Sequence, residues 1–347
     1  MRRNNKRKST QMVETKERNV NPRERLKTIK LETSPPVNSL KDLIKIGQDI
    51  IFYKNLDIIM LWRITPYLEE LDKMIGMDSL KESIFYQIIY YLKNMHIRNR
   101  NEEYLHTMIM GPPGAGKTTV ARILGKIYQV MGILSSDGPF IVAYRDDFIA
   151  GYLGQTAIKT RKLLDSCIGG VLFVDEVYSL GPGDNEKDSF SKEAIETITA
   201  FLSEHKNDFC FIGAGYEDEI KKCFFNANKG LERRFQWIHK IDKYSEEELT
   251  EIMMKMIDEM KWSVKVDKKD IIKILKNNIE LFKNAGGDIE TFLSKCKMVH
   301  AKRVFNLENE HKFIITKEDM EEAVKLVRKY RIIKEVKDDK PPFGMYC

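Results

Sequence analysis

The sequence lacks the features that mark secreted, zinc-binding or membrane-spanning proteins. Its five cysteines are scattered without a Cys-x-x-Cys pair, which argues against a zinc site and favours a reducing compartment. No apolar run approaches the roughly 20 residues that a membrane helix needs. The basic start is not followed by the apolar segment of a signal peptide. We therefore expect an intracellular protein, cytoplasmic or nuclear, that is not secreted and has no membrane partner.

Excess positive charge is also missing outside the first 30 residues. The 347-residue chain has a formal charge of +6, but residues 1–30 hold eleven Lys and Arg against three Glu, a net of +8. The remaining residues are therefore nearly neutral. Residues 1–38 contain too few apolar side chains to form a core, which predicts a disordered basic tail. This tail is either a solubilising segment or a contact for nucleic acid or a nuclear-import receptor.

Apolar patterns divide the rest of the chain into three parts. Residues 39–72 have apolar side chains at helical spacing and are expected to form a helical N-terminal element. In residues 73–243 short strand-like runs alternate with helical patterns, which predicts an α/β class with a doubly wound parallel sheet. Residues 244–335 show only helical patterns, so we expect a small all-helical domain without strands. Residues 336–347 are assigned to a C-terminal tail.

Individual elements can be placed within these parts. The apolar stretch that starts at Leu56 is expected to stop before Pro66, because proline removes a backbone donor and crowds the preceding turn. A helix is expected over Glu217 to Phe225. Besides the run Met108 to Met110, strands are expected over residues 140–144, 171–174, 209–214 and 235–241.

A glycine-rich loop stands between the run Met108 to Met110 and an amphipathic helix that includes Val120. Strand, loop and helix in this order are the context in which Gly-x-x-x-x-Gly-Lys-Thr binds phosphate, since backbone N–H groups and the helix N-terminus face the anion. Lys117 is expected to neutralise the β- and γ-phosphates, and the Thr118 hydroxyl to bind Mg²⁺. The loop residues expected to bind ATP are Gly111, Pro112, Pro113, Gly114, Ala115, Gly116, Lys117, Thr118 and Thr119.

A second motif supplies two carboxylates at the end of another buried strand. Val171 to Glu176 reads VLFVDE, four apolar residues followed by Asp175 and Glu176. Asp175 is expected to hold Mg²⁺, directly or through water, and Glu176 to act as the base for the attacking water. Because a glutamate stands where a base is needed, the two motifs together predict ATP hydrolysis rather than nucleotide binding alone.

Several sequence blocks resemble those of the AAA+ ATPases, in the CbxX/CfqX branch that includes the red-type rubisco activases and the sporulation stage V protein K. The resemblance covers roughly Ile75 to Ile241, and the blocks that carry it read GPPGAGKTTVA, DFIAGYLGQTAIKT, GGVLFVDEVYSL, SKEAIETI, IGAGYEDEI and GLERRF. The amino-acid sequences of these blocks, and of the block GGDIETFL, are similar to those found in proteins of large DNA viruses. The resemblance implies an α/β ATPase domain followed by a helical lid, and assembly into a hexameric ring.

The resemblance also implies roles for single residues. Ile75 and Gly76 match the segment that walls the adenine pocket. Tyr152 matches the aromatic pore-loop residue, which grips an extended polypeptide in the channel of the ring. Arg234 matches the arginine finger that one subunit inserts into the site of its neighbour, and Arg233 is the alternative because the sequence alone does not separate adjacent arginines.

The sequence departs from the resembling family at three places. Glu232 stands where members of this branch often carry arginine, two positions before the expected finger. Ile289 stands where the lid usually offers a sensor arginine. The strand before Tyr216 lacks the Asn or Thr that many AAA+ proteins use as a first sensor of the γ-phosphate. These departures predict slow hydrolysis.

Three hypotheses about function follow. The leading one is an oligomeric ATPase that remodels or threads a protein partner, which the Tyr152 loop favours. The second is a nucleic-acid-directed ATPase of the loader or initiator type, which the basic tail favours. The third is a nucleotide-gated scaffold that barely hydrolyses ATP, motivated by the missing sensor arginine.

Overall fold

The computed structural model describes residues 32–49, 51–97, 103–152, 154–182, 188–307 and 311–338. The basic segment that ends at residue 31 and the last nine residues, expected to be tails, lie outside these ranges. From Glu32 onward the chain makes contacts: the Lys54 N–H donates to the Glu32 carbonyl at 3.0 Å, and the Ser34 N–H to Asn55 Oδ1 at 2.8 Å. Within the described ranges, every helix is too short or too polar to cross a bilayer.

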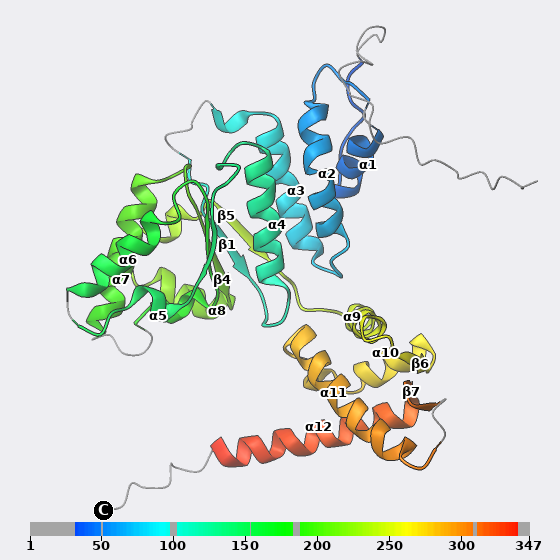
Figure 1. Ribbon diagram of the computed structural model, residues 1–347. Coiled ribbons are helices and arrows are strands. Elements are labelled where there is room, and N and C mark those ends of the chain that lie inside the picture. Colours follow the sequence, from blue (N-terminus) through cyan, green and yellow to red (C-terminus); the bar gives the residue numbers. More distant parts are fainter. Residues whose placement is uncertain are drawn as a thin grey trace, which may run out of the picture.

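A five-stranded, wholly parallel sheet forms the centre of the larger domain (Figure 1). Its strands lie in the order β2-β3-β4-β1-β5 and pair in register, with Thr107 beside both Ile212 and Trp237. Because the strands are parallel, their carboxyl ends meet along one edge, where ligands of such sheets bind. The strands are β1 (Thr107–Met110), β2 (Phe140–Ala143), β3 (Val171–Val174), β4 (Cys210–Gly215) and β5 (Trp237–Lys240).

Helices cover both faces of this sheet, as the doubly wound prediction requires. Side chains alternate along each strand: Phe173 contributes to the core on one face, and Leu172 and Val174 to the core on the other. The first face is covered by α3 (Asp78–Leu92) and α4 (Lys117–Val130), and outside them by α1 (Leu40–Asp49) and α2 (Ile58–Asp72). The second is covered by α5 (Arg145–Phe148), α6 (Gln155–Asp165) and α7 (Ser189–Glu204), while α8 (Glu217–Glu219) has no buried residue and leads into buried residues that begin at Ile220.

Short helical turns join several of these elements and position parts of the site described below. They are η2 (Met95–Ile97), η3 (Val177–Leu180), η4 (Ile220–Phe225) and η5 (Glu232–Arg234), with η6 (Ile279–Leu281) in the C-terminal part. The helix predicted over Glu217 to Phe225 is therefore split, with α8 continuing into η4, which has π-helical rather than α-helical hydrogen bonding.

Helix α2 runs through Pro66, where the sequence predicted a stop. Proline inside a helix costs about 3 kcal/mol. Burial offsets this cost, because the apolar side of α2 is fully buried against α1 and α4, and each such side chain contributes about 1.5–3 kcal/mol. The prediction was wrong because a local rule about proline does not include tertiary packing. The four fully buried side chains are Leu61, Ile64, Leu68 and Leu71.

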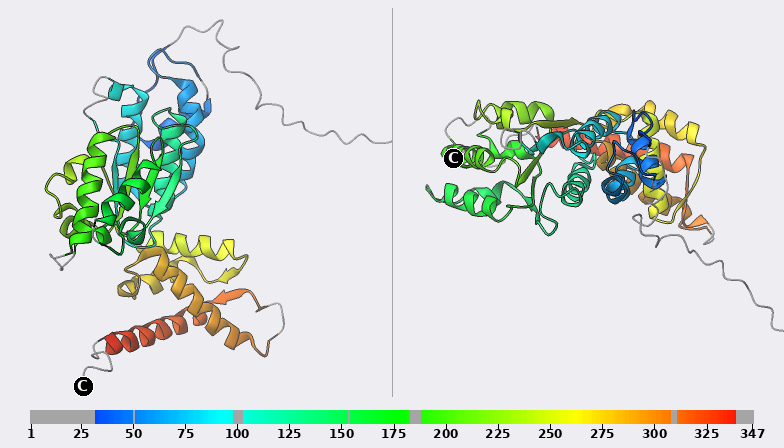
Figure 2. Two further views of the ribbon diagram at one scale, coloured as in Figure 1. Left: turned by 60° about the vertical axis from the view of Figure 1, so that its left-hand side comes forward. Right: turned by 90° about the horizontal axis from the view of Figure 1, so that it is seen from above.

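The C-terminal part, called the lid below, has its own apolar core and lies beneath the α/β domain in Figure 1 and in the left view of Figure 2. Its helices are α9 (Glu246–Glu259), α10 (Lys268–Lys276), α11 (Ala285–Val304) and α12 (Lys317–Asp338). The expectation that strands stop after Tyr244 was wrong. Two three-residue strands, β6 (Ser263–Lys265) and β7 (Ile314–Thr316), pair in parallel, and runs this short have no periodicity to detect.

Candidate active site

The glycine-rich loop connects the carboxyl end of β1 to the amino end of α4. Its first N–H, from Gly111, donates to the Gly215 carbonyl at 3.0 Å and so joins the loop to the end of β4. Gly114 and Gly116 have φ angles of +69° and +82°, in the left-handed region that favours glycine. The loop therefore takes a conformation that leads straight into a helix N-terminus, where free N–H groups attract phosphate.

Lys117 is the first residue of α4, and its side chain folds back under the loop. Its Nζ donates to the Pro112 carbonyl at 2.8 Å and to the Gly111 carbonyl at 3.3 Å. Burial lowers the pKa of this ammonium group, while Asp175 and Glu176 oppose the shift. The residue is 8% exposed. A nearly buried cation that faces two carboxylates is well placed to receive the charge of a triphosphate.

Asp175 and Glu176 follow β3, as the sequence predicted for this strand. The Asp175 Oδ1 accepts the Glu176 N–H at 3.0 Å, and the Glu176 carbonyl accepts the Ser179 N–H at 2.8 Å. Glu176 has a φ of +49°, a strained value for a residue with a side chain. This tight turn places both carboxylates at the edge where the phosphate loop begins, with β4 between β3 and β1.

A divalent cation fits this donor set. The Thr118 hydroxyl, in the first turn of α4, and the Asp175 carboxylate are both oxygen donors, which Mg²⁺ prefers. Such an ion would neutralise charge on the phosphate oxygens when bound. The neighbouring Thr119 is exposed on the same turn, and Pro113 is half-buried.

The segment around Gly76 lies between the phosphate loop and the lid. Gly76 has a φ of +63°, and a Cβ there would collide with the Glu248 carboxylate and lie 3.1 Å from the Tyr244 ring. On its other side, a Cβ at Gly116 would lie 2.9 Å from the Met74 methyl. The half-buried Ile75, which stands between Met74 and Gly76, is therefore beside the loop.

The start of α11 in the lid contacts the phosphate loop through glycine. A Cβ at Gly114 would lie 2.7 Å from the Gly287 nitrogen, and one at Gly286 would lie 2.8 Å from the Gly114 carbonyl. Ile289, the position matched to a sensor arginine, is fully buried in the lid core. No basic side chain is therefore offered by Asn284 to Ile289 at this contact.

The two candidate finger arginines differ in their surroundings. The Arg234 Nε donates to the Ser203 hydroxyl at 2.7 Å and to the Thr199 carbonyl at 3.1 Å, and its Nη1 donates to the Gly230 carbonyl. Arg234 is thus bound to α7 of its own chain. Arg233 is exposed beside it in η5.

Tyr152 lies on the loop between α5 and α6 and is 74% exposed. Hydrogen bonds fasten the loop on both sides of it: the Lys159 Nζ donates to the Ile149 carbonyl at 3.0 Å, and the Ala150 N–H to Thr156 Oγ1 at 3.2 Å. A Cβ at Gly151 would meet nothing within 4 Å. The tyrosine is therefore held on an anchored loop with open space around it.

An arginine that the sequence motifs did not single out connects α5, which precedes this loop, to the turn that follows Glu176. Arg145, at the start of α5, donates through Nη1 to the Ser179 carbonyl in η3, three residues after Glu176. Its Nη2 pairs with Asp188 Oδ2 at 2.7 Å, and Asp188 caps α7. No local sequence pattern predicts these contacts, because the residues that make them come from three separate elements.

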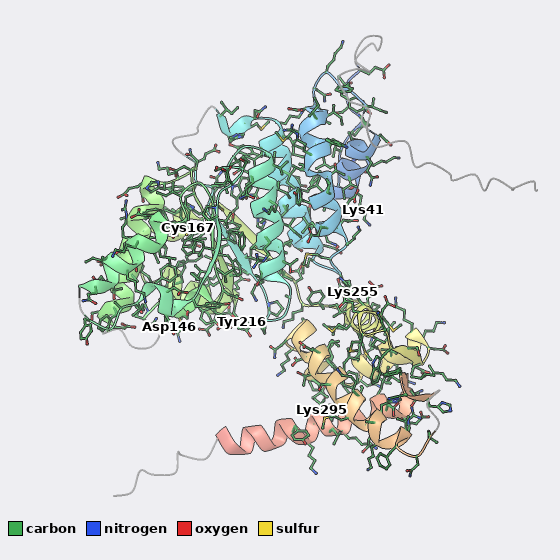
Figure 3. The ribbon with its side chains drawn as sticks, viewed as in Figure 1. Lys41, Asp146, Cys167, Tyr216, Lys255 and Lys295 are labelled. Carbon is green, nitrogen blue, oxygen red and sulfur yellow. The ribbon has the colours of Figure 1, made fainter. Side chains whose placement is uncertain are left out.

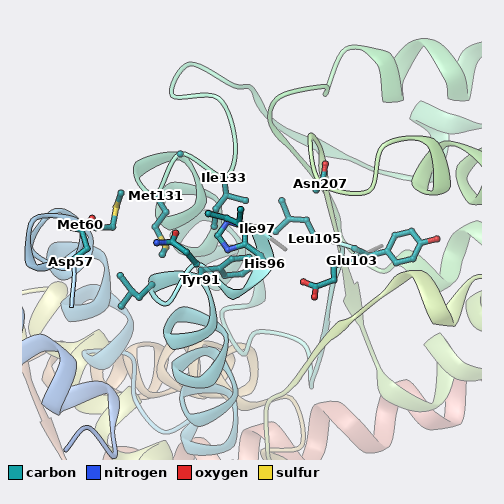
Figure 4. Close-up of a pocket in the computed structure, with 14 residues that line it drawn as sticks. Asp57, Met60, Tyr91, His96, Ile97, Glu103, Leu105, Met131, Ile133 and Asn207 are labelled. Carbon is teal, nitrogen blue, oxygen red and sulfur yellow. The ribbon is translucent and has the colours of Figure 1, made fainter. Parts of the chain in front are cut away.

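A cavity of about 250 Å³ lies at the opposite end of the sheet from the phosphate loop (Figure 4). It opens before β1 and at the carboxyl end of α4, and its lining includes Tyr91, His96, Glu103, Leu105, Ile133 and Asn207. None of the expected ATP-binding residues lines it, so it is separate from the candidate site.

Known proteins resemble this chain in sequence and in fold. Residues 107–242 match the family of ATPases associated with various cellular activities (AAA). The chain is 40% identical to a CfxQ-like protein of Acanthamoeba polyphaga mimivirus, over 78% of this chain and 67% of the relative. It is 36% identical to stage V sporulation protein K of Bacillus subtilis (63% and 69%) and 33% identical to a CfxQ homolog of Galdieria sulphuraria (74% and 85%).

Solved structures agree on the fold. The FIGL-1 AAA domain in complex with ADP superposes with a TM-score of 0.51 at 16% identity, over 80% of this chain and 88% of that domain. A RuvB variant of Thermotoga maritima gives 0.50 at 18% identity, over 74% and 72%. The fold and the site thus define a P-loop ATPase of the AAA class. Within this class, the chain belongs to the family of CfxQ-like proteins, CbbX and stage V sporulation protein K.

Proposed function

We propose that this ATPase uses Mg²⁺-dependent ATP hydrolysis in a ring of identical subunits to remodel or thread a protein partner. Nucleotide binding and ATPase class follow from the family. The ring, the metal ion and the protein substrate are the proposed part. The single observation that best supports threading is the anchored, outward-facing Tyr152 loop, tied through Arg145 to the turn that bears Glu176.

Each residue of the site has a defined task in this proposal. The loop N–H groups and Lys117 bind the phosphates, and Ile75 and Gly76 wall the base. Thr118 and Asp175 hold Mg²⁺, which neutralises charge on the phosphate oxygens when bound. The remaining loop residues that complete the cradle are Gly111, Pro112, Pro113, Gly114, Ala115, Gly116 and Thr119.

Glu176 is the proposed base, because its carboxylate lies at the strand end beside the phosphate loop and can accept a proton from water.

The proposal also needs an arginine finger, whose planar guanidinium group reaches the γ-phosphate. Such fingers raise the rate of hydrolysis by about 10³–10⁵-fold. Arg233 is exposed and, among the residues that the structure describes, its side chain makes no hydrogen bond that would hold it back from a neighbouring subunit. Arg234 would first have to leave Ser203 and Thr199. We therefore favour Arg233 as the finger, with Arg234 holding η5 in place.

The proposal is tested by measuring ATP turnover with unfolded polypeptide, native candidate proteins and DNA in turn. Unfolded polypeptide should raise turnover of the wild-type protein, and the Tyr152→Ala variant should lose this stimulation while keeping its basal rate. Stimulation by DNA alone would replace the proposal with a nucleic-acid-directed ATPase, and deletion of residues 1–31 would then show whether the basic segment carries that binding. Negligible turnover under every condition would favour the nucleotide-gated scaffold.

A further inference from the structure

The residue that follows β4 occupies a central place in the site. β4 lies between β3, which ends at the two carboxylates, and β1, which leads into the phosphate loop. The Gly215 carbonyl at the end of β4 accepts the Gly111 N–H of that loop at 3.0 Å. Tyr216, the next residue, therefore begins directly beside the phosphate loop, and Figure 3 shows it at the edge of the α/β domain that faces the lid.

The Tyr216 side chain lies near residues of the candidate site. The Lys117 Nζ lies 6.0 Å from the centre of its ring, and the Tyr178 ring lies 6.1 Å away. Burial raises the pKa of the Tyr216 hydroxyl, and the negative charges of Glu176 and of Asp288 in the lid raise it further. A tyrosine hydroxyl is protonated at neutral pH even without these effects, so it is available as a hydrogen-bond donor.

This hydroxyl has no hydrogen-bond partner among the described residues, and Tyr216 as a whole is 36% exposed. Tyr216 lies near Lys117, and Glu176 and Asp288, the latter in the first turn of α11, are close enough to affect its hydroxyl. We infer that the Tyr216 hydroxyl donates a hydrogen bond to the γ-phosphate of bound ATP. In this position it takes the part of the polar first sensor that the strand before it lacks.

The chemistry of this contact resembles that of an oxyanion hole. Charge on the γ-phosphate oxygens is redistributed during transfer, and a fixed O–H donor stabilises it without reorganisation. ADP has no γ-phosphate, so the hydroxyl also distinguishes the nucleotide before hydrolysis from the product. The inference rests on ATP hydrolysis alone and needs neither a ring substrate nor the Tyr152 loop.

The test compares Tyr216→Phe with wild type in ATP turnover and in ATP and ADP affinity by calorimetry. Losing one donor should lower kcat by about 10²-fold. It should weaken ATP binding by about tenfold, the typical effect of a hydrogen bond to a charged group, and leave ADP binding unchanged. Tyr86→Phe is the matched control, since Tyr86 is an exposed tyrosine of α3 that should affect none of these values.

Two results would overturn the inference. Wild-type turnover together with an unchanged ratio of ATP to ADP affinity would show that the hydroxyl does not touch the γ-phosphate. An equal loss of affinity for both nucleotides, with a lower melting temperature, would assign Tyr216 a structural role. Either result leaves the remodelling proposal standing, because that proposal is decided by polypeptide stimulation of the wild-type protein.

Discussion

The Nε of Arg234 donates a hydrogen bond to the Ser203 hydroxyl at 2.7 Å, which ties η5 to α7 of the same chain. Its exposed neighbour Arg233 is free of this constraint on the η5 surface. The two arginines are adjacent in sequence, yet one is bound to its own chain and the other faces outward. Their substitutions should therefore have different effects.

Arg233→Ala should keep ATP binding and the melting temperature while removing most hydrolysis, because we propose that this arginine acts on the site of the neighbouring subunit. Mixing it with Lys117→Ala should restore some turnover, since one variant has an intact phosphate loop and the other an intact finger. Arg234→Ala should destabilise the fold by about 1–3 kcal/mol through lost hydrogen bonds, measured by urea denaturation. Full ATPase activity of the Arg233→Ala variant would indicate that Arg234, rather than Arg233, is the arginine finger.

Lys117→Ala and Glu176→Gln should separate binding from chemistry. The first removes the cation that is buried under the phosphate loop, so ATP affinity measured by calorimetry should fall by at least about 10²-fold, as expected for a charge-assisted contact. The second keeps the shape of the side chain but not its basicity, so it should bind ATP normally and barely turn over. Wild-type turnover of Glu176→Gln would exclude Glu176 as the base.

Tyr152→Ala should retain ATP binding, assembly and basal turnover, and lose stimulation by unfolded polypeptide. The aromatic face supplies contact area at low entropy cost and grips many sequences alike. Tyr152→Phe is the matched variant and should behave nearly as wild type, since the hydroxyl is not needed. An alanine variant that is stimulated as strongly as wild type would count against the pore-loop role.

Arg145→Ala should uncouple the loop from the site. Hydrogen exchange of residues 149–152 should respond to ATP in the Glu176→Gln protein, and this response should disappear when Arg145→Ala is added, because the contact with Ser179 is lost. Arg161→Ala serves as the control, since its ion pairs with Asp165 and Glu204 are exposed and do not reach η3. The same response in all three proteins would refute the coupling.

Stability should decrease below neutral pH because two histidines are buried. Burial lowers the pKa of both His106 and His239 from 6.5 to about 4. As the pH falls through this window the unfolded chain takes up protons first, so each histidine lowers the free energy of unfolding by up to about 1.4 kcal/mol per pH unit. Urea denaturation at neutral and mildly acidic pH measures this slope, and His239→Gln should reduce it. An identical slope in the variant would contradict the assignment.

Features that depend on neighbouring residues could be predicted from the sequence. The glycine-rich turn and the apolar strand before Asp175 follow local rules, since φ angles and side-chain alternation are set within a few residues. Contacts between distant segments could not be predicted. Arg145 and Ser179 are 34 positions apart, and Arg234 and Ser203 are 31 apart, so only the assembled fold reveals them. The helix through Pro66 likewise depends on packing that no local rule contains.

The hydrogen bond between Arg145 and the Ser179 carbonyl links α5 to the turn that follows Glu176. If a polypeptide is held at Tyr152, tension on the loop is transmitted through α5 to the short turn that orients Glu176. A substrate that resists unfolding would then displace the Glu176 carboxylate and slow ATP hydrolysis. We expect ATP hydrolysis to be slow when the bound partner resists unfolding and fast when it unfolds easily. The mechanical stability of a partner, more than its sequence, would then decide whether it is remodelled.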